Sequence, residues 1–227
     1  PSEKAIDFVK KFEYRKAYVT VDASLLEIQG FDLASLHYGF FVDQVYVDSC
    51  EVEVFIDLRK ELSPIKKPMP IDMIRDIEIP IEVKKIVLAN SKLYYHHQAK
   101  ETSRGHGKLY AENVNAEVRS ISNIHKQGIA DIEINVSGKL MNNAIAKIEL
   151  NYLGGNKHNR FNSTLSLSAM PVTDYNAILY PSLGVNIRSG YCSSFKVNMS
   201  GNAYEATGKL DIVYDHLKVA IPPNQEG

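Results

Sequence analysis

Tryptophan is absent from this chain of 227 residues, and cysteine occurs only twice, at Cys50 and Cys192. The two cysteines lie far apart and form no CxxC pattern, so the sequence contains neither a redox-active thiol pair nor a cysteine-rich zinc motif. Both cysteines lie within strand-like segments. Two interpretations stay open for them: a disulfide, or two separate buried thiols.

Long apolar runs and an excess of one charge are also missing. No apolar run approaches the roughly 20 residues that a membrane-spanning helix needs, and no signal peptide is visible. The net charge is −1 and the isoelectric point is near 6.8. The basic pairs at 66–67 and 84–85 are isolated. Nucleic acid is therefore not expected as a partner.

The motifs of the common enzyme classes are missing as well. There is no GxSxG elbow, and Cys192 has no histidine near it in sequence. No GK[ST] follows the glycines at 105–107 or 154–155, so neither segment is a phosphate loop. Two acidic residues of a glycan hydrolase could still meet in space. The acidic residues fall on the polar phase of the predicted strands, however, which favours a solvated face. We expect no catalytic residue and no cofactor.

Histidine is the remaining candidate metal ligand. His96, His97 and His106 cluster around one polar segment, and a zinc site needs three or four converging ligands. His96 and His97 are adjacent in a predicted strand, so their side chains point to opposite faces and only one of them could join His106. The pattern favours exposed loop histidines, and we predict no metal site.

The chain does have hydrophobic alternation with a period of two over most of its length. Ile132, Ile134 and Val136, for example, alternate with Glu133 and Asn135. Successive side chains of a strand point to opposite faces, so this pattern predicts sheets with one apolar and one polar face. Strands are expected at 17–21, 25–29, 77–83, 86–88, 93–97, 109–111, 113–121, 128–138, 143–153, 160–169, 185–188, 191–200, 203–214 and 216–221, and segment 40–58 is expected to be a pair of strands.

The predicted fold class is mainly β. Short spacing between the strands favours an elongated, strongly twisted antiparallel meander that curls into a groove or forms a sandwich. Breaks are expected at 48–49 and 90–91, and a polar hairpin loop at 98–107. Two short helices are expected, one near 3–12 with Ser2 as its N-cap, the other near 174–180 with Asp174 as its N-cap and Pro181 as its end.

Prolines interrupt this pattern in two places. Segment 61–70 holds three prolines and cannot be a central strand. We predict one domain over 1–227, with a possible boundary at this loop. Pro80 lies inside the alternating run 77–83, which argues for an edge strand or a bulge.

The apolar phase of the strands has to be covered. Two sheets can face each other, or one sheet can curl around itself. A filled core is the simpler interpretation. An unclosed curl would instead leave an apolar groove suited to acyl chains, because each buried CH₂ contributes about 0.8 kcal/mol. The candidate groove residues are Ile132, Ile134, Val136, Ile148, Leu150, Leu165, Leu167, Val185, Ile187, Phe195, Val197, Met199, Leu210 and Ile212.

In segments 47–52, 86–95, 107–123, 170–190 and 208–219, the sequence resembles AsmA-like envelope proteins of the Bacteroidetes type. Residues 170–190 (MPVTDYNAILYPSLGVNIRSG) are similar to the family's C-terminal turn and strand, and residues 208–219 (GKLDIVYDHLKV) are similar to its closing strand. Residues 47–52, 86–95 and 107–123 are similar to its repeated strand–turn–strand units. The resemblance covers about residues 30–221.

This resemblance implies a fragment of a larger periplasmic protein, held in the inner membrane by an anchor upstream of Pro1. The family is related to bridge-like lipid-transfer proteins and is linked to outer-membrane assembly. It implies phospholipid or another acyl-chain ligand, other envelope proteins as partners, and lipid binding or transport without catalysis. The alternative is a structural or protein-interaction β-sandwich domain of the cell envelope.

Overall fold

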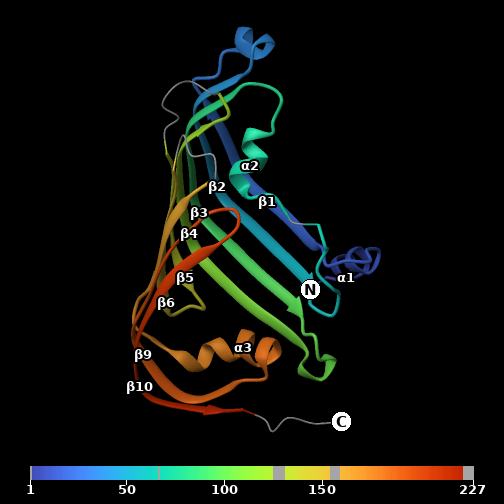
Figure 1. The fold of residues 1–227 in the computed structure, drawn as a ribbon, viewed down its shortest axis with the longest axis vertical. Coiled ribbons are helices and arrows are strands. Elements are labelled where there is room, and N and C mark those ends of the chain that lie inside the picture. The colour runs from blue at the N-terminus through green and yellow to red at the C-terminus, as the bar shows by residue number, and fades with distance from the viewer. Residues whose placement is uncertain (1, 66, 125–130, 154–158, 222–227) are drawn as a thin grey trace.

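Ten strands form a single open sheet in the computed structural model, which describes residues 2–65, 67–124, 131–153 and 159–221. The strand order is β1-β2-β3-β4-β5-β6-β7-β9-β10, and the two-residue β8 pairs with β9. Most neighbours are antiparallel, which confirms the predicted mainly-β class. Figure 1 shows the sheet curving around one side, with α2 and α3 on its inner side.

The strands are β1 Ala17–Gln29, β2 Phe40–Asp57, β3 Ile81–Gln98, β4 His106–Ser122, β5 Ile132–Leu140, β6 Ala144–Tyr152, β7 Phe161–Leu167, β8 Met170–Pro171, β9 Asn186–Gly201 and β10 Ala206–Ala220. The α-helices are α1 Glu3–Lys10, α2 Pro70–Arg75 and α3 Asn176–Leu183. Short 3-10 turns cover η1 Leu33–His37, η2 Thr102–Arg104 and η3 Val172–Tyr175. Part of the predicted strand 128–138 lies outside the described residues.

Several strands continue through positions where the sequence predicted breaks. Ser49 and Asn90 have φ angles of 53° and 50°, and Asn113 on the neighbouring β4 has a φ of 50°. A residue in this left-handed region can form a bulge, so the strand bends and its pairing resumes beyond it. The pairing of β2 with β1 and β3 keeps its register through Ser49, whereas the β3–β4 register shifts between Leu88 and Ser91 and the β4–β5 register shifts between Glu112 and Asn115. The expected breaks at 48–49 and 90–91 are therefore bends within continuous strands, with bulges in the pairing on the β4 side.

The expectation of a purely antiparallel meander is wrong for one pair. β2 and β3 are parallel, with Val47 beside Leu88. Parallel neighbours need a crossover that brings the chain back to the end where the first strand began. Residues 58–80 supply it, so the proline-rich segment 61–70 lies in a crossover within one sheet.

The structure differs from the expectations near two prolines, Pro80 and Pro70. Strand β3 begins at Ile81 and not at Ile77, because Pro80 has no N–H to donate to a neighbouring strand. The carbonyls of Ile77 and Ile79 instead accept hydrogen bonds from Asn123 Nδ2, each at 2.7 Å. The helix α2 was not predicted at all, although proline at its first position fits a helix start.

The C-terminal helix differs from its prediction at both ends. Asp174 lies within η3 and makes no capping bond to α3. Pro181 lies inside α3, buried, so it does not end the helix. The helix ends instead at Gly184, whose φ of 71° is the left-handed conformation of a helix C-cap, with its N–H donating to Tyr180 O at 2.8 Å.

The N-terminal helix follows its prediction closely. Ser2 is the N-cap of α1, since its hydroxyl accepts a hydrogen bond from Ala5 N at 3.3 Å. Ala5 and Val9, one helical turn apart, are each 1% exposed and pack against Phe55 of β2. The helix ends two residues before the predicted boundary at residue 12.

Candidate functional site: an apolar trough

The inner face of the sheet carries an uninterrupted row of apolar residues from one edge strand to the other. Each member is the cross-strand partner of the next, in the order Leu26, Val47, Leu88, Ala116, Val136, Ile148, Leu165, Val197 and Leu210. Cross-strand partners share a face of a sheet. We call this row and the apolar residues beside it the trough.

Most of the predicted groove residues come together in the trough. Beside the central row lie the partners Ile134 and Leu150, and on its other side Leu167, Phe195 and Ile212. Thirteen of the fourteen candidates lie in strands. The exception is Val185, which precedes β9. The strand expected at 185–188 therefore starts one residue later, at Asn186. The thirteen are Ile132, Ile134, Val136, Ile148, Leu150, Leu165, Leu167, Ile187, Phe195, Val197, Met199, Leu210 and Ile212.

Helix α2 covers one side of the trough, at one end of the strands. Ile71 is its buried residue, 3% exposed, and packs against Ile132 and Tyr152 of β5 and β6. Asn159, itself buried, accepts a hydrogen bond from Arg75 Nη1 and donates one to Asp72 Oδ1. This amide ties both ends of α2 to the chain segment that precedes β7.

Helix α3 covers the opposite side of the trough, at the other end of the strands (Figure 1). The buried residues there are Ala144, Met170 and Cys192. The side chain of Asn176 donates to Ile187 O and accepts from Ile187 N, both at 2.7 Å, and so holds the start of α3 against β9. Because Ala144 and Ile132 lie near opposite ends of the β5–β6 pair, the two helices cover opposite ends of the same face.

Further along α3, Ser182 Oγ lies 3.3 Å from Nε2 of His97 on β3. The helix therefore contacts both β9 and β3, and it runs across the strands along this side of the trough. His97 is 1% exposed, and its ring lies against Gly107, where any side chain would collide with it. Burial lowers the pKa of His97, with a smaller contribution from His106, so the ring is neutral near pH 7.

Between the two helices the trough is open to solvent. Ile148 is 37% exposed, and Leu210, on the edge strand, is 55% exposed. The neighbouring Met199 and Ile212 are 40% and 43% exposed. A contiguous exposed apolar patch of this kind is typical of a surface that binds a ligand or another molecule.

The opposite face of the same strands is polar. Lys147, Ser166 and Lys196 are cross-strand partners on β6, β7 and β9, in a row parallel to the trough. Glu149, Thr164 and Asn198 form the next such row. The sheet is therefore amphipathic, with the apolar side turned toward the helices.

The candidate metal ligands and thiols do not gather into a site. His96 lies on the face opposite His97, as expected, with Nε2 3.9 Å from Glu53, and burial lowers its pKa. Within the described residues, no group of three or more histidine, cysteine, aspartate or glutamate residues is placed to hold a metal ion. Cys50 and Cys192 are both buried and free, so the interpretation as separate thiols fits the structure.

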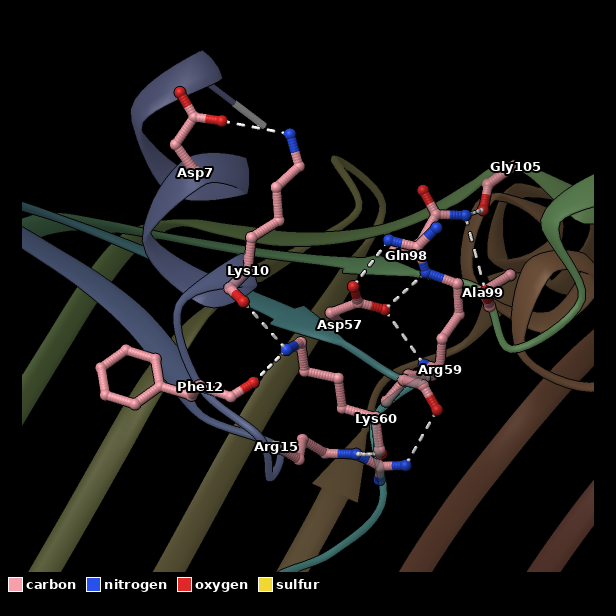
Figure 2. A network of polar contacts seen from close by, with 11 residues as sticks. Asp7, Lys10, Phe12, Arg15, Asp57, Arg59, Lys60, Gln98, Ala99 and Gly105 are labelled. Carbon is pink, nitrogen blue, oxygen red and sulfur yellow. Dashed lines mark hydrogen bonds and ion pairs between the residues drawn. The ribbon is translucent and has the colours of Figure 1, made fainter.

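A polar network lies near α1 at the end of β2 (Figure 2). Asp57 is 3% exposed and accepts from Arg59 Nε at 2.9 Å and from Arg59 Nη2 at 2.7 Å; these bonds hold the pKa of the carboxyl below its usual range. Arg15 donates to the carbonyls of Leu58 and Lys60, and the Lys60 ammonium donates to Phe12 O. These bonds join the turn after β2 to the N-terminal segment. The Asp57 carboxylate is therefore bound in a structural ion pair.

One hydroxyl beside the trough lacks a partner. The hydroxyl of Tyr175 is buried without a hydrogen bond to any residue that the structure describes, and burial raises its pKa to about 12. An unsatisfied buried hydroxyl costs about 1–3 kcal/mol. Replacing Tyr175 with Phe is thus expected to raise the free energy of unfolding by about 1 kcal/mol. Chemical denaturation measures this difference, and an equal loss of stability would contradict it.

Sequence reasoning found the C-terminal half of the trough and missed the N-terminal half. Leu26, Val47 and Leu88 belong to the central row but were not candidates. The sequence shows the alternation around Val47, but the left-handed residue Ser49 changes which positions of β2 face the trough beyond it. The buried Ile71 on α2 was also missed, because a six-residue helix after a proline-rich loop gives no periodic signal.

Comparison with known proteins adds nothing to this description: no family model, no curated protein and no solved structure matches the chain. Among the described residues, no helix has the length and apolar character needed to cross a membrane. The resemblance to AsmA-like envelope proteins stays a prediction from sequence.

Proposed function

We propose that this chain is a non-catalytic module that binds lipid, or conveys it, along the trough. The observation that carries the proposal is the apolar row that crosses nine strands and stays open to solvent between α2 and α3. An ordinary core would be covered along its whole length. Here α2 and α3 contact the face at the two ends of the strands, and no other helix among the described residues packs between them (Figure 1).

The dimensions of the trough suit an acyl chain. Eight strand-to-strand steps of about 4.8 Å give a path of roughly 40 Å across the sheet. Each methylene moved from water into the trough contributes about 0.8 kcal/mol, so a ten-carbon segment contributes about 8 kcal/mol before the ordering costs of binding. That margin is sufficient for specific binding without any charged contact.

The cellular setting of the proposal comes from the AsmA-like resemblance. In this setting the chain is part of a periplasmic protein with an inner-membrane anchor upstream of Pro1, and it acts in outer-membrane assembly or maintenance. Phospholipid is the proposed ligand, and other envelope proteins are the proposed partners.

The test compares two charged substitutions on adjacent residues of β7. Leu165 lies in the central row, whereas Ser166 points to the polar face between Lys147 and Lys196. Organic extracts of the purified wild-type protein are expected to contain phospholipid by mass spectrometry. Leu165→Asp should reduce the recovered lipid about tenfold, because a carboxylate in the trough loses its hydration when a chain binds. Ser166→Asp should leave it unchanged.

Two results would count against the lipid proposal: wild-type extracts without phospholipid, or a Leu165→Asp variant that simply unfolds while Ser166→Asp does not. They would favour the alternative, a structural or protein-interaction domain of the envelope. The two edge strands support this alternative, since β1 and β10 each have one neighbour among the described strands and carry exposed apolar residues such as Val21 and Val213. Edge strands of this kind accept strands from partner proteins.

A further inference from the structure

A separate cavity of about 360 Å³ lies where the trough meets η3 and α3. Leu167, Phe195 and Ile212, which form the trough row next to the central one, make up one side. Tyr175 and Leu179 line it from the helical segment, and Leu217 lines it from the end of β10.

The surface of this cavity is entirely apolar. No polar atom is exposed to it. The Tyr175 hydroxyl, although part of a lining residue, is buried away from solvent. The Sγ of Cys192 donates to Ser194 O at 3.3 Å. A headgroup, a sugar or an ion would find no partner here, so only a hydrocarbon suits the cavity.

The size of the cavity sets the kind of hydrocarbon. An apolar cavity of about 150 Å³ holds a benzene ring, and the volume here is more than twice as large. It has room for a segment on the order of ten carbons. Because one of its sides is itself a row of the trough, a chain that lies in the trough can enter the cavity without crossing any polar group.

We propose that this cavity receives the terminal segment of an unbranched alkyl chain whose remainder lies in the trough. This inference rests on the proposed lipid-binding function and adds a fixed site for the chain end. Headgroups then lie away from α3, on the open side of the trough. The cavity then selects ligands by a hydrocarbon end that carries no polar group.

The absence of tryptophan from the chain makes a direct experiment possible. Leu179→Trp places one fluorescent side chain in the cavity and takes up part of its volume. Leu183→Trp places one on the same helix outside it, where Leu183 is 63% exposed. The probe is lauroyl-lysophosphatidylcholine below its micelle concentration, with calorimetry measuring its affinity for the wild-type protein and for both variants.

Leu179→Trp is expected to weaken binding about tenfold, because each methylene displaced from the cavity costs about fourfold in affinity. Leu183→Trp should bind as the wild type does. A probe brominated at its terminal carbon should quench the tryptophan of L179W and not that of L183W. If L179W does not fold, Leu217→Trp, at the 37% exposed rim, takes its place with the same expectations.

The possible failures are distinguishable. If the wild type binds the probe and Leu165→Asp abolishes binding, while L179W and L183W behave alike, the cavity inference is wrong and the lipid-binding proposal stands. If the wild type does not bind any alkyl probe, both are wrong. A cavity that binds a sterol-like ring system more tightly than the alkyl chain would also overturn the inference.

Discussion

Replacing Phe55 with Ala is expected to lower the free energy of unfolding by about 3–5 kcal/mol. The phenyl ring is 2% exposed and packs against Ala5 and Val9, the two buried residues of α1. Ile6, Phe8 and Tyr18 pack around the same cluster. Removing the ring leaves a cavity and takes away the surface on which α1 docks, so the loss is expected near the upper end of this range.

Urea denaturation followed by circular dichroism measures the loss at Phe55. The matched control is Tyr14→Ala, because Tyr14 is 36% exposed and lies in the same N-terminal segment; its cost should stay within about 1 kcal/mol. Phe55 and Ile56 point to opposite faces, and Ile56 shares its face with His97, which contacts α3. Lipid affinity should therefore persist in the folded fraction of Phe55→Ala, and a loss of both properties would contradict this assignment of faces.

Replacing Ile71 with Ala is expected to cost about 2–5 kcal/mol, although Ile71 lies in a helix of only six residues. Its side chain, 3% exposed, is the part of α2 that is fully buried against Ile132 and Tyr152. A helix this short has little stability of its own, so α2 depends on the packing of Ile71 to stay helical. Loss of the contact should also uncover the side of the trough that α2 covers.

The control for Ile71 lies on the same helix. Met73 is 60% exposed, and Met73→Ala should change stability by no more than about 0.5 kcal/mol. Thermal unfolding compares the two variants, and limited proteolysis within residues 58–80 shows whether the crossover has come loose. Equal stabilities of the two variants would mean that α2 does not cover this side of the trough.

The sequence pattern predicts which residues share the apolar face of a strand, but it does not predict which strands pair. Alternation placed Val136, Ile148 and Leu165 on apolar faces, and the structure puts them in one row. That the row continues to Leu26 depends on the parallel pairing of β2 with β3, which follows from where the crossover returns. No local pattern contains that information, because a period of two is the same in parallel and antiparallel strands.

The sequence also does not predict that the trough is open to solvent. A filled core and an open groove use the same apolar residues, and the difference lies in where α2 and α3 pack. Local chemistry does predict part of this: Ser2 was identified as a cap from residue type alone, and it caps α1. Asp174 is also a residue type that favours the N-cap position, yet its carboxylate accepts a hydrogen bond from Asn143. Tertiary contacts decide between such competing roles.

The parallel pair at the centre of the N-terminal half has a consequence for the order of folding. Each antiparallel neighbour from β4 to β7 is reached by a short connection, so the closing of small loops assembles that part of the sheet. β2 meets β3 only after residues 58–80 have crossed back, and closing a long loop costs more entropy than closing a short one. We therefore expect the β1–β2 hairpin and the β3–β10 meander to form as separate units. Their union along β2 and β3 would then be the slow step that completes the path across the sheet.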